Sequence, residues 1–541
     1  MKQIFQTGAD LLIDRLHQWG IRHLFGMPGS HSLAIYDALY RSGSIGSILI
    51  RNEQAGAYCA DGYARASGQP GVICTTAGPG ATNALSGIAE AFSDGSPVLL
   101  LTGQVNHDKL DREYGNYHEI DLEGIFRPCT RFVKTITSLE EIPSSVDTAF
   151  LAMLNGRPRS AALILPQDLM AKKLTSNDQE RIDNQITAIP TITSRDQLVP
   201  EQTEIQKALK LILSMEHPVI VAGGGAIWSD AGAAILQLSE QLHCPIVTTL
   251  NGKGIVDERH PFALGHARTK SGWQALSEAD GMIAIGCRFT EVFTWFDTLP
   301  IPNKRLQIDI DLASIGVRFP IDLGLIGDAR NITQILCLEL SQNRFPYQSS
   351  WQSFFAKPKT ALTEPEWIIE SLRQILPEDA IIYSDASEMA IRFQTDFPVY
   401  RPRSLFYPST YIALGWGFPA AIGGAIACPD RTIVSFSGDG GFTMTAQELS
   451  TAVRYRLRII IIVHNDQSYG AIRHQQRMKC EGRYLDTELN NPDFLRLAEA
   501  YGVPAFRTSE KNAFRSVVRD ALNRQGPTLI EVPDEWRWLR S

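Results

Sequence analysis

Two acidic residues in the last quarter of the sequence have types and spacing that suit a metal ion. Asp439 directly follows the apolar run TIVSFSG, with Gly440 and Gly441 after it, and Asp466 directly follows the run IIIIVHN. Positions 439 and 466 are 27 residues apart, the span of one β-α-β unit, so both side chains should lie at the carboxyl ends of neighbouring parallel strands. Carboxylate oxygens bind Mg²⁺, and glycine amides allow close approach of phosphate. The pattern predicts a Mg²⁺–diphosphate site.

The elements that could carry such a site run through the whole chain. Short apolar runs such as GVICTT, PVLLLTG, PVIVAGG and IIIIVHN alternate with helical patterns. Most of these runs are continuous, as strands covered on both faces should be. Two polar stretches, residues 172–202 and 342–366, are typical of linkers. We therefore predict an α/β protein of three doubly wound parallel-sheet domains, at residues 1–175, 196–342 and 360–541.

Composition excludes several classes of function. The chain has 541 residues, a formal net charge of −8 and 44% hydrophobic residues, so we expect no nucleic-acid partner. The most apolar run, RIIIIVH, is too short to span a bilayer, and the N-terminus lacks the pattern of a signal peptide. Eight cysteines without a C-x-x-C pair argue against a zinc site or a disulfide framework. These features predict a cytoplasmic protein without membrane contact.

Longer stretches of the sequence resemble a known enzyme family. Gly438-Asp439-Gly440 followed by Asn465-Asp466 is similar to the cofactor motif of thiamine diphosphate enzymes related to acetolactate synthase and the 2-oxo-acid decarboxylases. RNEQAGAYCADGYARASGQPGV looks like their pyrimidine-binding domain, VIVAGGGAIWSDAGAAI like their middle domain and YIALGWGFPAAIGGAIACPDRTIVSFSGDGGF like their diphosphate-binding domain. The resemblance implies thiamine diphosphate, Mg²⁺, this three-domain fold and a homodimer or homotetramer with active sites at the subunit interface.

The resemblance assigns several C-terminal residues to cofactor binding by position. Asp439 and Asp466 would bind Mg²⁺ through their side chains and Ser468 through its carbonyl, although the family commonly has Asn in place of Asp466. Leu414 would hold the cofactor bent, and the Ile412 carbonyl would accept a hydrogen bond from its exocyclic amine. Taken alone, Leu414 would be interpreted as a core leucine. Further contacts would come from Ser387, Glu388, Gly438, Gly440, Gly441, Tyr469 and Gly470.

Glu53 is the expected catalytic carboxyl group of the N-terminal domain. It follows the apolar run SILI, and the small residues Ala55, Gly56 and Ala57 after it should let a flat ring approach. A carboxyl group in an apolar pocket could share a proton with the cofactor's pyrimidine ring, and Glu53 stands at the family's catalytic position. By itself the residue could equally be a helix N-terminal glutamate that faces the helix dipole. The C-terminal motif in the same chain favours the catalytic role.

Residues on the substrate side depart from those of acetolactate synthases. His31 in PGSHSL and His118 in GNYHEIDLEG would lie on loops that face the cofactor. His118 stands where these synthases usually carry Gln, and Gln475 stands where they carry Trp. A histidine with a pKa near neutrality can move the proton that releases product, while a loop histidine bonded to backbone is the alternative for both. Tyr469 and Ala471 would border the same pocket.

These residues together predict a lyase or transferase that acts on 2-oxo acids. We expect decarboxylation of a 2-oxo acid followed by carboligation to a second carbonyl, with a decarboxylase that releases an aldehyde as the alternative. An FAD-containing oxidoreductase and a catalytically silent paralogue are further alternatives, and the presence of Glu53 and the acid pair argues against the latter. The glycine-rich VAGGGAIWSD is weak evidence for a nucleotide. TEVFTWFDTLP departs from FAD-binding relatives, so we expect no FAD, while a regulatory nucleotide stays open.

Overall fold

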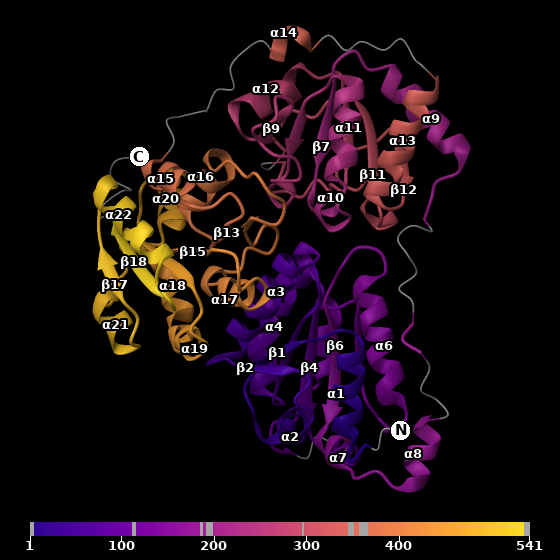
Figure 1. Cartoon of the computed structure of the whole chain (residues 1–541), viewed down its shortest axis with the longest axis vertical. Helices are drawn as coiled ribbons and strands as arrows, with labels where there is room; N and C mark the ends of the chain where they lie inside the picture. Colours follow the sequence, from indigo (N-terminus) through magenta and orange to yellow (C-terminus); the bar gives the residue numbers. More distant parts are fainter. Residues whose placement is uncertain are drawn as a thin grey trace.

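Three six-stranded parallel sheets follow one another along the chain, each with helices on its faces (Figure 1). The computed structural model describes residues 5–110, 115–183, 188–190, 198–294, 297–343, 351–355 and 366–534. The predicted fold class, three α/β domains with parallel sheets, is confirmed. The predicted linker 172–202 contains a short helix and otherwise lies partly outside the described residues, as does most of the predicted linker 342–366.

The N-terminal sheet has the strand order β2-β1-β3-β4-β6-β5. Its strands are β1 (His23–Gly26), β2 (Gly46–Leu49), β3 (Gly71–Thr75), β4 (Val98–Gln104), β5 (Phe132–Thr135) and β6 (Ala161–Pro166). Its helices are α1 (Gly8–Gln18), α2 (Leu33–Ser42), α3 (Glu53–Ser67), α4 (Pro79–Asp94), α5 (Leu122–Phe126), α6 (Glu141–Leu154), α7 (Gln167–Ala171) and α8 (Ser176–Asp183).

The middle sheet has a different order, β12-β11-β10-β7-β8-β9. Its strands are β7 (Pro218–Ala222), β8 (Ile246–Thr248), β9 (Ala263–His266), β10 (Gly281–Ile285), β11 (Lys304–Asp309) and β12 (Leu323–Ile326). Its helices are α9 (Gln202–Leu213), α10 (Gly224–Trp228), α11 (Gly232–Leu242), α12 (Lys270–Glu278), α13 (Ala329–Asn343) and α14 (Gln352–Phe355).

The C-terminal sheet has the order β14-β13-β15-β16-β18-β17. Its strands are β13 (Ile381–Ser384), β14 (Leu405–Phe406), β15 (Ile433–Gly438), β16 (Ile459–Asn465), β17 (Ala505–Arg507) and β18 (Thr528–Pro533). Its helices are α15 (Trp367–Ile375), α16 (Glu388–Asp396), α17 (Gly417–Ala427), α18 (Asp439–Thr445), α19 (Leu449–Arg454), α20 (Gly470–Lys479), α21 (Phe494–Ala500) and α22 (Lys511–Leu522).

The N-terminal and C-terminal domains are joined by close packing of α3 against α17. A Cβ atom on Gly62 would lie 2.1 Å from the carbonyl oxygen of Ala420, and one on Gly423 would lie 1.9 Å from the carbonyl oxygen of Cys59. Each glycine therefore lets the backbone of one helix touch the other. The Tyr383 hydroxyl donates to the Gly62 carbonyl at 2.9 Å, which ties β13 to the same contact.

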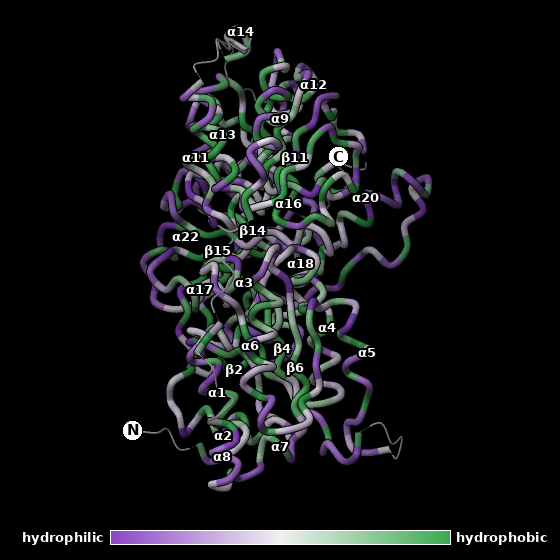
Figure 2. The backbone as a smooth tube through the Cα atoms, turned by 90° about the vertical axis from the view of Figure 1, so that its right-hand side faces the viewer, coloured by the Kyte–Doolittle hydropathy of each residue, from purple (hydrophilic) through white to green (hydrophobic). Residues whose placement is uncertain are grey.

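Apolar cores lie inside the domains, and one of them continues across the α3–α17 contact. That core includes Tyr58 of α3, Phe418 and Ile422 of α17 and Trp416 just before α17, whereas the middle domain has a core of its own. Hydrophobic residues concentrate in the interior segments and hydrophilic residues at the periphery (Figure 2). Among the described residues, no helix is long and apolar enough to cross a membrane.

Candidate active site

The predicted acid pair lies at the carboxyl edge of the C-terminal sheet. β15 and β16 are parallel neighbours with Gly438 opposite His464, so Asp439 and Asp466 both follow where these strands end. Their exposed fractions are 1% and 7%. Burial and, second, the charge of Asp466 raise the pKa of Asp439 to about 6, and burial also raises the pKa of Asp466. Two buried carboxylates that repel each other favour a divalent cation at this edge.

Two glycines leave room for side chains at this edge, Gly470 for Asp466 and Gly440 for Tyr469. A Cβ atom on Gly470 would lie 2.7 Å from Asp466 Oδ2, and one on Gly440 would lie 2.6 Å from a ring carbon of Tyr469. Ser468 is buried, and its backbone amide and its hydroxyl each lie 3.1 Å from Asp466 Oδ1, to which both can donate. The turn between β16 and α20 is therefore shaped around the Asp466 carboxylate.

Two buried hydroxyl groups have no hydrogen-bond partner in the described part of the chain: that of Ser387, which lies against Gly438, and that of Ser437, two residues before Asp439. Ser387 precedes α16 without capping it, and its Cβ would lie 3.5 Å from a Cβ on Gly438. Glu388 adds its charge to the effect of burial on the pKa of Asp466. Buried hydroxyls without partners are costly, and phosphate oxygens would accept their hydrogen bonds. The donor set fits Mg²⁺ and a diphosphate group.

Ile412 and Leu414 lie on segment 407–416, which connects β14 to α17. Ile412 has a φ of +60°, an unfavourable conformation for a β-branched residue. Leu414 is only partly buried, unlike a core leucine, and its Cδ1 would lie 3.4 Å from a Cβ on Gly441. Asp385 accepts a hydrogen bond from the Gly415 amide at 3.1 Å, and burial raises the pKa of this carboxyl to about 7.

Glu53 is the first residue of α3 and is 3% exposed. Its Oε2 accepts a hydrogen bond from Asn83 Nδ2 at 3.0 Å, and a Cβ on Gly80 would lie 3.1 Å from its Oε1. The N-cap is Asn52, whose side chain accepts from the Gln54 amide at 2.8 Å. Glu53 is therefore not needed as the cap of this helix, and its carboxylate is directed toward the first turns of α4.

The small residues after Glu53 have a different role from the one expected. An added Cβ on Gly56 would lie 2.3 Å from Ile50 Cδ1 and 3.1 Å from Ile73 Cδ1, and Ala57 lies against Gly87 of α4. Gly56 and Ala57 therefore let α3 pack closely on the sheet and on α4. The space beside these two residues is filled by protein atoms, so neither of them leaves room for a flat ring.

His31 and His118 lie side by side near the turn that precedes α4. Their ring centroids are 5.5 Å apart, and the ring of Tyr117 lies 5.6 Å from the first and 3.8 Å from the second. The Nδ1 atoms of both histidines are buried and have no hydrogen-bond partner in the described chain. His118 has a φ of +67° and lies against Gly78. Burial and, second, the charge of His118 lower the pKa of His31.

Helix α20 has one buried residue with structural contacts, Arg473, and an exposed face. Arg473 is 4% exposed, donates to Glu488 Oε1 at 3.1 Å and lies 4.2 Å from the ring centroid of Tyr484. These contacts fix the helix on the loop that follows it. The predicted pocket residues Ala471 and Gln475 are exposed in the single chain, as is His474 between them.

Two site residues were not found from the sequence because they are brought in by the tertiary fold. Asn491 donates through Nδ2 to Asp439 Oδ2 at 2.5 Å and to Asn465 Oδ1 at 3.0 Å. Asn83, 30 residues after Glu53, holds that carboxylate. Neither asparagine follows a strand end directly, so no local pattern marks it.

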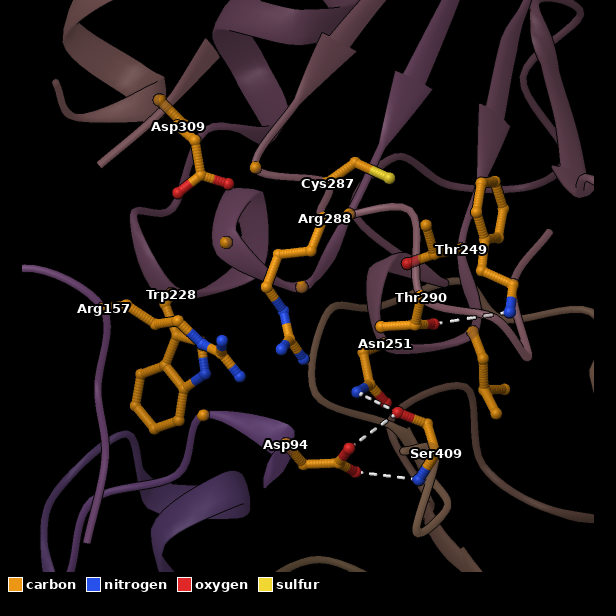
Figure 3. Close-up of a pocket in the computed structure, with 18 of the residues that line it drawn as sticks. Asp94, Arg157, Trp228, Thr249, Asn251, Cys287, Arg288, Thr290, Asp309 and Ser409 are labelled. Atoms are coloured by element: carbon orange, nitrogen blue, oxygen red, sulfur yellow. Dashed lines mark hydrogen bonds between the residues drawn. The ribbon is translucent and has the colours of Figure 1, made fainter. Parts of the chain in front are cut away.

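A cavity of about 110 Å³ lies where the three domains meet (Figure 3). Gly223–Gly225 after β7 border it, and the guanidinium groups of Arg157 and Arg288 extend into the same space (Figure 3). Both donate to the Ser93 carbonyl, at 2.7 and 3.0 Å. Burial and, second, the charge of Arg288 lower the pKa of Arg157 to about 8. The same cavity is also lined by the carboxyl groups of Asp94, Asp309 and Asp328, so it holds charges of both signs.

Glu53 and the acid pair belong to different sheets. Within the described residues, Glu53 and Asp439 share no hydrogen-bond partner and no close contact. The single chain therefore presents two half-sites rather than one closed pocket.

Comparison with known proteins agrees with this geometry over nearly the whole chain. The models for the N-terminal, central and C-terminal domains of thiamine pyrophosphate (thiamine diphosphate) enzymes match residues 6–125, 205–336 and 385–532. The chain is 36% identical to a probable acetolactate synthase large subunit of Methanocaldococcus jannaschii, over 97% of this chain and 91% of that protein. It is 32% identical to the acetolactate synthase isozyme 3 large subunit of Escherichia coli, over 96% and 92%.

A fungal protein extends the range of relatives. The acetolactate synthase catalytic subunit of Aspergillus candidus is 30% identical, over 98% of this chain and 80% of that protein. Matches to all three domain models and to full-length relatives lead to one assignment. The chain belongs to the thiamine pyrophosphate enzyme family, among the acetolactate synthase-like proteins.

Proposed function

We propose that this chain uses thiamine diphosphate and Mg²⁺ to decarboxylate a small 2-oxo acid and to join the product to a second carbonyl compound. The observation that carries the proposal is the buried pair Asp439 and Asp466 at the ends of adjacent parallel strands. Its relatives are acetolactate synthases by name. An acid pair and two buried hydroxyls without partners in the described chain suit a metal diphosphate.

In this proposal the residues of the C-terminal edge bind and orient the cofactor. Asp439, Asp466 and the Ser468 carbonyl hold Mg²⁺. The hydroxyl of Ser387, the side chain of Glu388 and the backbone of the glycine turn lie on the diphosphate side: Gly438, Gly440, Gly441 and Gly470. Ile412, Leu414 and Tyr469 line the rest of the cofactor site. Thiamine diphosphate, when bound, supplies a nucleophilic carbon and an electron sink for the bond that CO₂ leaves.

Glu53 holds the proton that the cofactor's pyrimidine ring needs. Its carboxyl group is almost fully buried and keeps a hydrogen bond to Asn83, so its orientation is fixed before any ligand binds. A carboxyl group that is positioned and shielded from water transfers a proton efficiently. Glu53 lies against Gly80 at the start of α4, and His118 lies against Gly78 just before this helix.

His31 and His118 would handle protons on the substrate side. Both Nδ1 atoms are buried and unpartnered within the described residues, so each can bind a substrate oxygen or carry a proton. This feature favours the second candidate function, a decarboxylase that releases an aldehyde, because release requires a proton donor at the new carbon centre. Tyr469, Ala471 and Gln475 would border the second carbonyl.

We further propose a homodimer or homotetramer in which Glu53 of one chain faces the acid pair of another. The separation of the two half-sites within one chain supports this arrangement. Large apolar side chains around the cofactor segment are exposed in the single chain: Tyr411 (53%), Ile412 (36%), Met444 (46%) and Ile472 (51%). Covering them by a second copy would remove apolar surface from water.

We propose that the enzyme works without FAD and in the cytoplasm. The central cavity of about 110 Å³ is small compared with pockets for ligands of ordinary drug size. Its arginines and carboxyl groups offer charges of both signs, so a nucleotide without flavin stays an alternative occupant. Flavin absorbance of the purified protein tests whether FAD is bound. The cytoplasmic location stays a prediction from the sequence.

Product analysis tests the reaction. Purified protein with thiamine diphosphate and Mg²⁺ would be incubated with a panel of 2-oxo acids while CO₂ and organic products are followed together. One acetohydroxy acid or hydroxy ketone per CO₂ supports carboligation, and one aldehyde per CO₂ supports the decarboxylase. His118→Gln should shift the ratio toward carboligation if His118 is the proton donor. Absence of CO₂ release from every 2-oxo acid would contradict both candidates.

A further inference from the structure

We infer that a buried cluster in the N-terminal domain positions the cofactor segment 407–416 of the C-terminal domain. The Arg65 cluster consists of Arg65 and Asp61 of α3 and of Glu90 and Asp94 of α4. Glu90 is the positioning residue that fixes Ala413, between Ile412 and Leu414. The role of the segment rests on the proposed function, whereas the contacts that define the cluster do not.

The Arg65 cluster is almost fully removed from water. The four side chains are 6%, 0%, 0% and 1% exposed, in the order Arg65, Asp61, Glu90 and Asp94. Arg65 Nε lies 3.0 Å from both carboxylate oxygens of Asp61. Its Nη1 donates to Asp94 Oδ2 at 3.0 Å and its Nη2 to Glu90 Oε1 at 3.3 Å. One guanidinium group thus organises three carboxyl groups.

Every carboxyl group of the cluster also accepts a hydrogen bond from the segment or its end. The Ala413 amide donates to Glu90 Oε2 at 3.0 Å. The Ser409 amide donates to Asp94 Oδ2 at 2.8 Å, and its hydroxyl donates to Asp94 Oδ1 at 3.0 Å. Trp416 Nε1 donates to Asp61 Oδ2 at 2.7 Å.

Arg65 itself completes the set of contacts. Its Nη1 donates to the Tyr407 carbonyl at 3.0 Å, and its guanidinium carbon lies 4.8 Å from the centroid of the Trp416 ring. The segment is therefore held at residues 407, 409, 413 and 416 by side chains of another domain.

The strained backbone at Ile412 explains why segment 407–416 needs these contacts. Ile412 has a φ of +60°, and a β-branched residue adopts that conformation only where its surroundings enforce it. The Ala413 amide is fixed by Glu90, and the Gly415 amide is fixed by Asp385. Leu414 lies between these two bonds. The segment around Leu414 is thus fixed from two sides, by Glu90 of the N-terminal domain and by Asp385 of the C-terminal domain.

Glu90 and Asp94 of the Arg65 cluster differ in their protonation. Three carboxyl groups face one guanidinium group, so a cluster with all three ionised would carry excess negative charge in a buried place. Burial and, second, the charge of Asp94 raise the pKa of Glu90 well above its usual range. In contrast, Arg65 holds the pKa of Asp94 low against the effect of burial. A neutral Glu90 can accept from Ala413 without adding a buried charge.

Hydrogen exchange of the protein without cofactor tests the positioning directly. In Glu90→Ala, we expect the amides of segment 407–416 to exchange about tenfold faster or more, because the Ala413 amide loses its acceptor. Glu90→Gln keeps a side-chain oxygen at this position and should restore most of the protection. The matched control is Asp147→Asn, because Asp147 forms a buried pair with Arg15 in the same domain, with Nε–Oδ1 at 2.7 Å, away from the segment. It should lower the melting temperature without changing exchange of 407–416.

Binding of thiamine diphosphate with Mg²⁺ gives the second readout. We expect Glu90→Ala to raise the dissociation constant about tenfold, with Glu90→Gln close to the unmodified protein. Unchanged exchange in Glu90→Ala, or equal acceleration in Asp147→Asn, would overturn the inference. Failure of the unmodified protein to bind the cofactor would overturn the proposed function, while the exchange data would still decide this inference. If Glu90→Ala does not fold, Asp94→Asn should loosen the segment at Ser409, because Ser409 donates to both oxygens of Asp94 and the side-chain amide keeps only one of them. Full protection there would overturn the inference.

Discussion

The N-terminal and C-terminal domains have the same strand order but different chemistry at the same edge. Numbered from the first strand of each domain, both sheets read 2-1-3-4-6-5. In the N-terminal domain the second strand leads to Glu53, whereas in the C-terminal domain it leads to segment 407–416. The third and fourth strands end near Gly78 and the histidines in one domain and at Asp439 and Asp466 in the other. One topology thus supports a proton site and a metal–phosphate site.

The middle domain departs from this shared order. Read from the β9 edge toward β12, its strands follow a 3-2-1-4-5-6 order, the order associated with dinucleotide-binding domains. The cavity beside it is lined by Arg157 and Arg288 together with the carboxyl groups of Asp94, Asp309 and Asp328. Strand order therefore indicates where a site can form, and the side chains gathered there determine what it can bind.

The largest expected effect concerns the proton site of the N-terminal domain. Glu53→Gln keeps the size of the side chain and removes the transferable proton, so turnover should fall about 10³-fold. The dissociation constant for thiamine diphosphate should change much less, because the metal–phosphate site is untouched. Steady-state kinetics and cofactor titration measure the two effects. Glu141→Gln, at a glutamate of the same domain paired with Lys134 at 2.6 Å, is the control, and equal loss there would contradict the assignment.

The next effect is on stability and comes from Glu448, which joins the two domains. This carboxyl accepts from the Arg51 and Asn52 amides at 2.9 and 3.1 Å, and burial raises its pKa from 4.5 to about 7. The folded state therefore holds this proton more tightly than the unfolded chain. Its stabilising effect is full below pH 4.5 and is lost as the pH rises through about 7, a change of up to about 3 kcal/mol.

Denaturant unfolding across that pH range measures this contribution. Glu448→Gln stays neutral and should lose less stability than the unmodified protein between pH 4.5 and 7. Glu378→Gln, at an exposed glutamate paired with Arg259, should leave the pH dependence unchanged. An identical pH profile for Glu448→Gln and the unmodified protein would show that folding does not raise the pKa of this carboxyl.

The third effect concerns α3 and α17, which occupy equivalent places in their domains because each follows the second strand of its sheet. Gly62→Ala places a methyl group where the Ala420 carbonyl lies, so the free energy of unfolding should fall by about 1–3 kcal/mol. Gly423→Ala, in the equivalent helix, should give a loss of similar size because its Cβ would meet the Cys59 carbonyl. Chemical denaturation of both variants measures this. A loss confined to one variant would show that the contact is not symmetric.

The smallest effect concerns the metal site. Asp466→Asn keeps an oxygen ligand but removes one negative charge, so the dissociation constant for Mg²⁺ with thiamine diphosphate present should rise by about tenfold or less. The pKa of Asp439 should also fall, because the charge of Asp466 contributes to its rise. Magnesium titration by calorimetry tests the first expectation. An unchanged affinity for Mg²⁺ would show that the charge of Asp466 does not strengthen metal binding over the asparagine that is common at this position in the family.

Much of this architecture could be predicted from the sequence because its strongest signals are local. Continuous apolar runs marked buried parallel strands, and the spacing of Asp439 and Asp466 placed them on adjacent strands, as β15 and β16 are. Asn491, Asn83 and Glu90 could not be found this way. Each acts on a partner distant along the chain, and an asparagine or glutamate inside a helix or loop has no pattern that shows what it will touch. Gly56 was misinterpreted because glycine serves helix packing and ligand approach alike.

The glycine contact between α3 and α17 has a mechanical consequence. Because the Ala420 and Cys59 carbonyls fill the space where side chains would stand, neither helix can slide along the other without a collision of backbone atoms. Shear between these two domains is therefore blocked, and such sliding is one of the usual ways in which enzymes close over a substrate. Motion during turnover must be carried by loops at the sheet edges or by movement of the middle domain against this rigid pair.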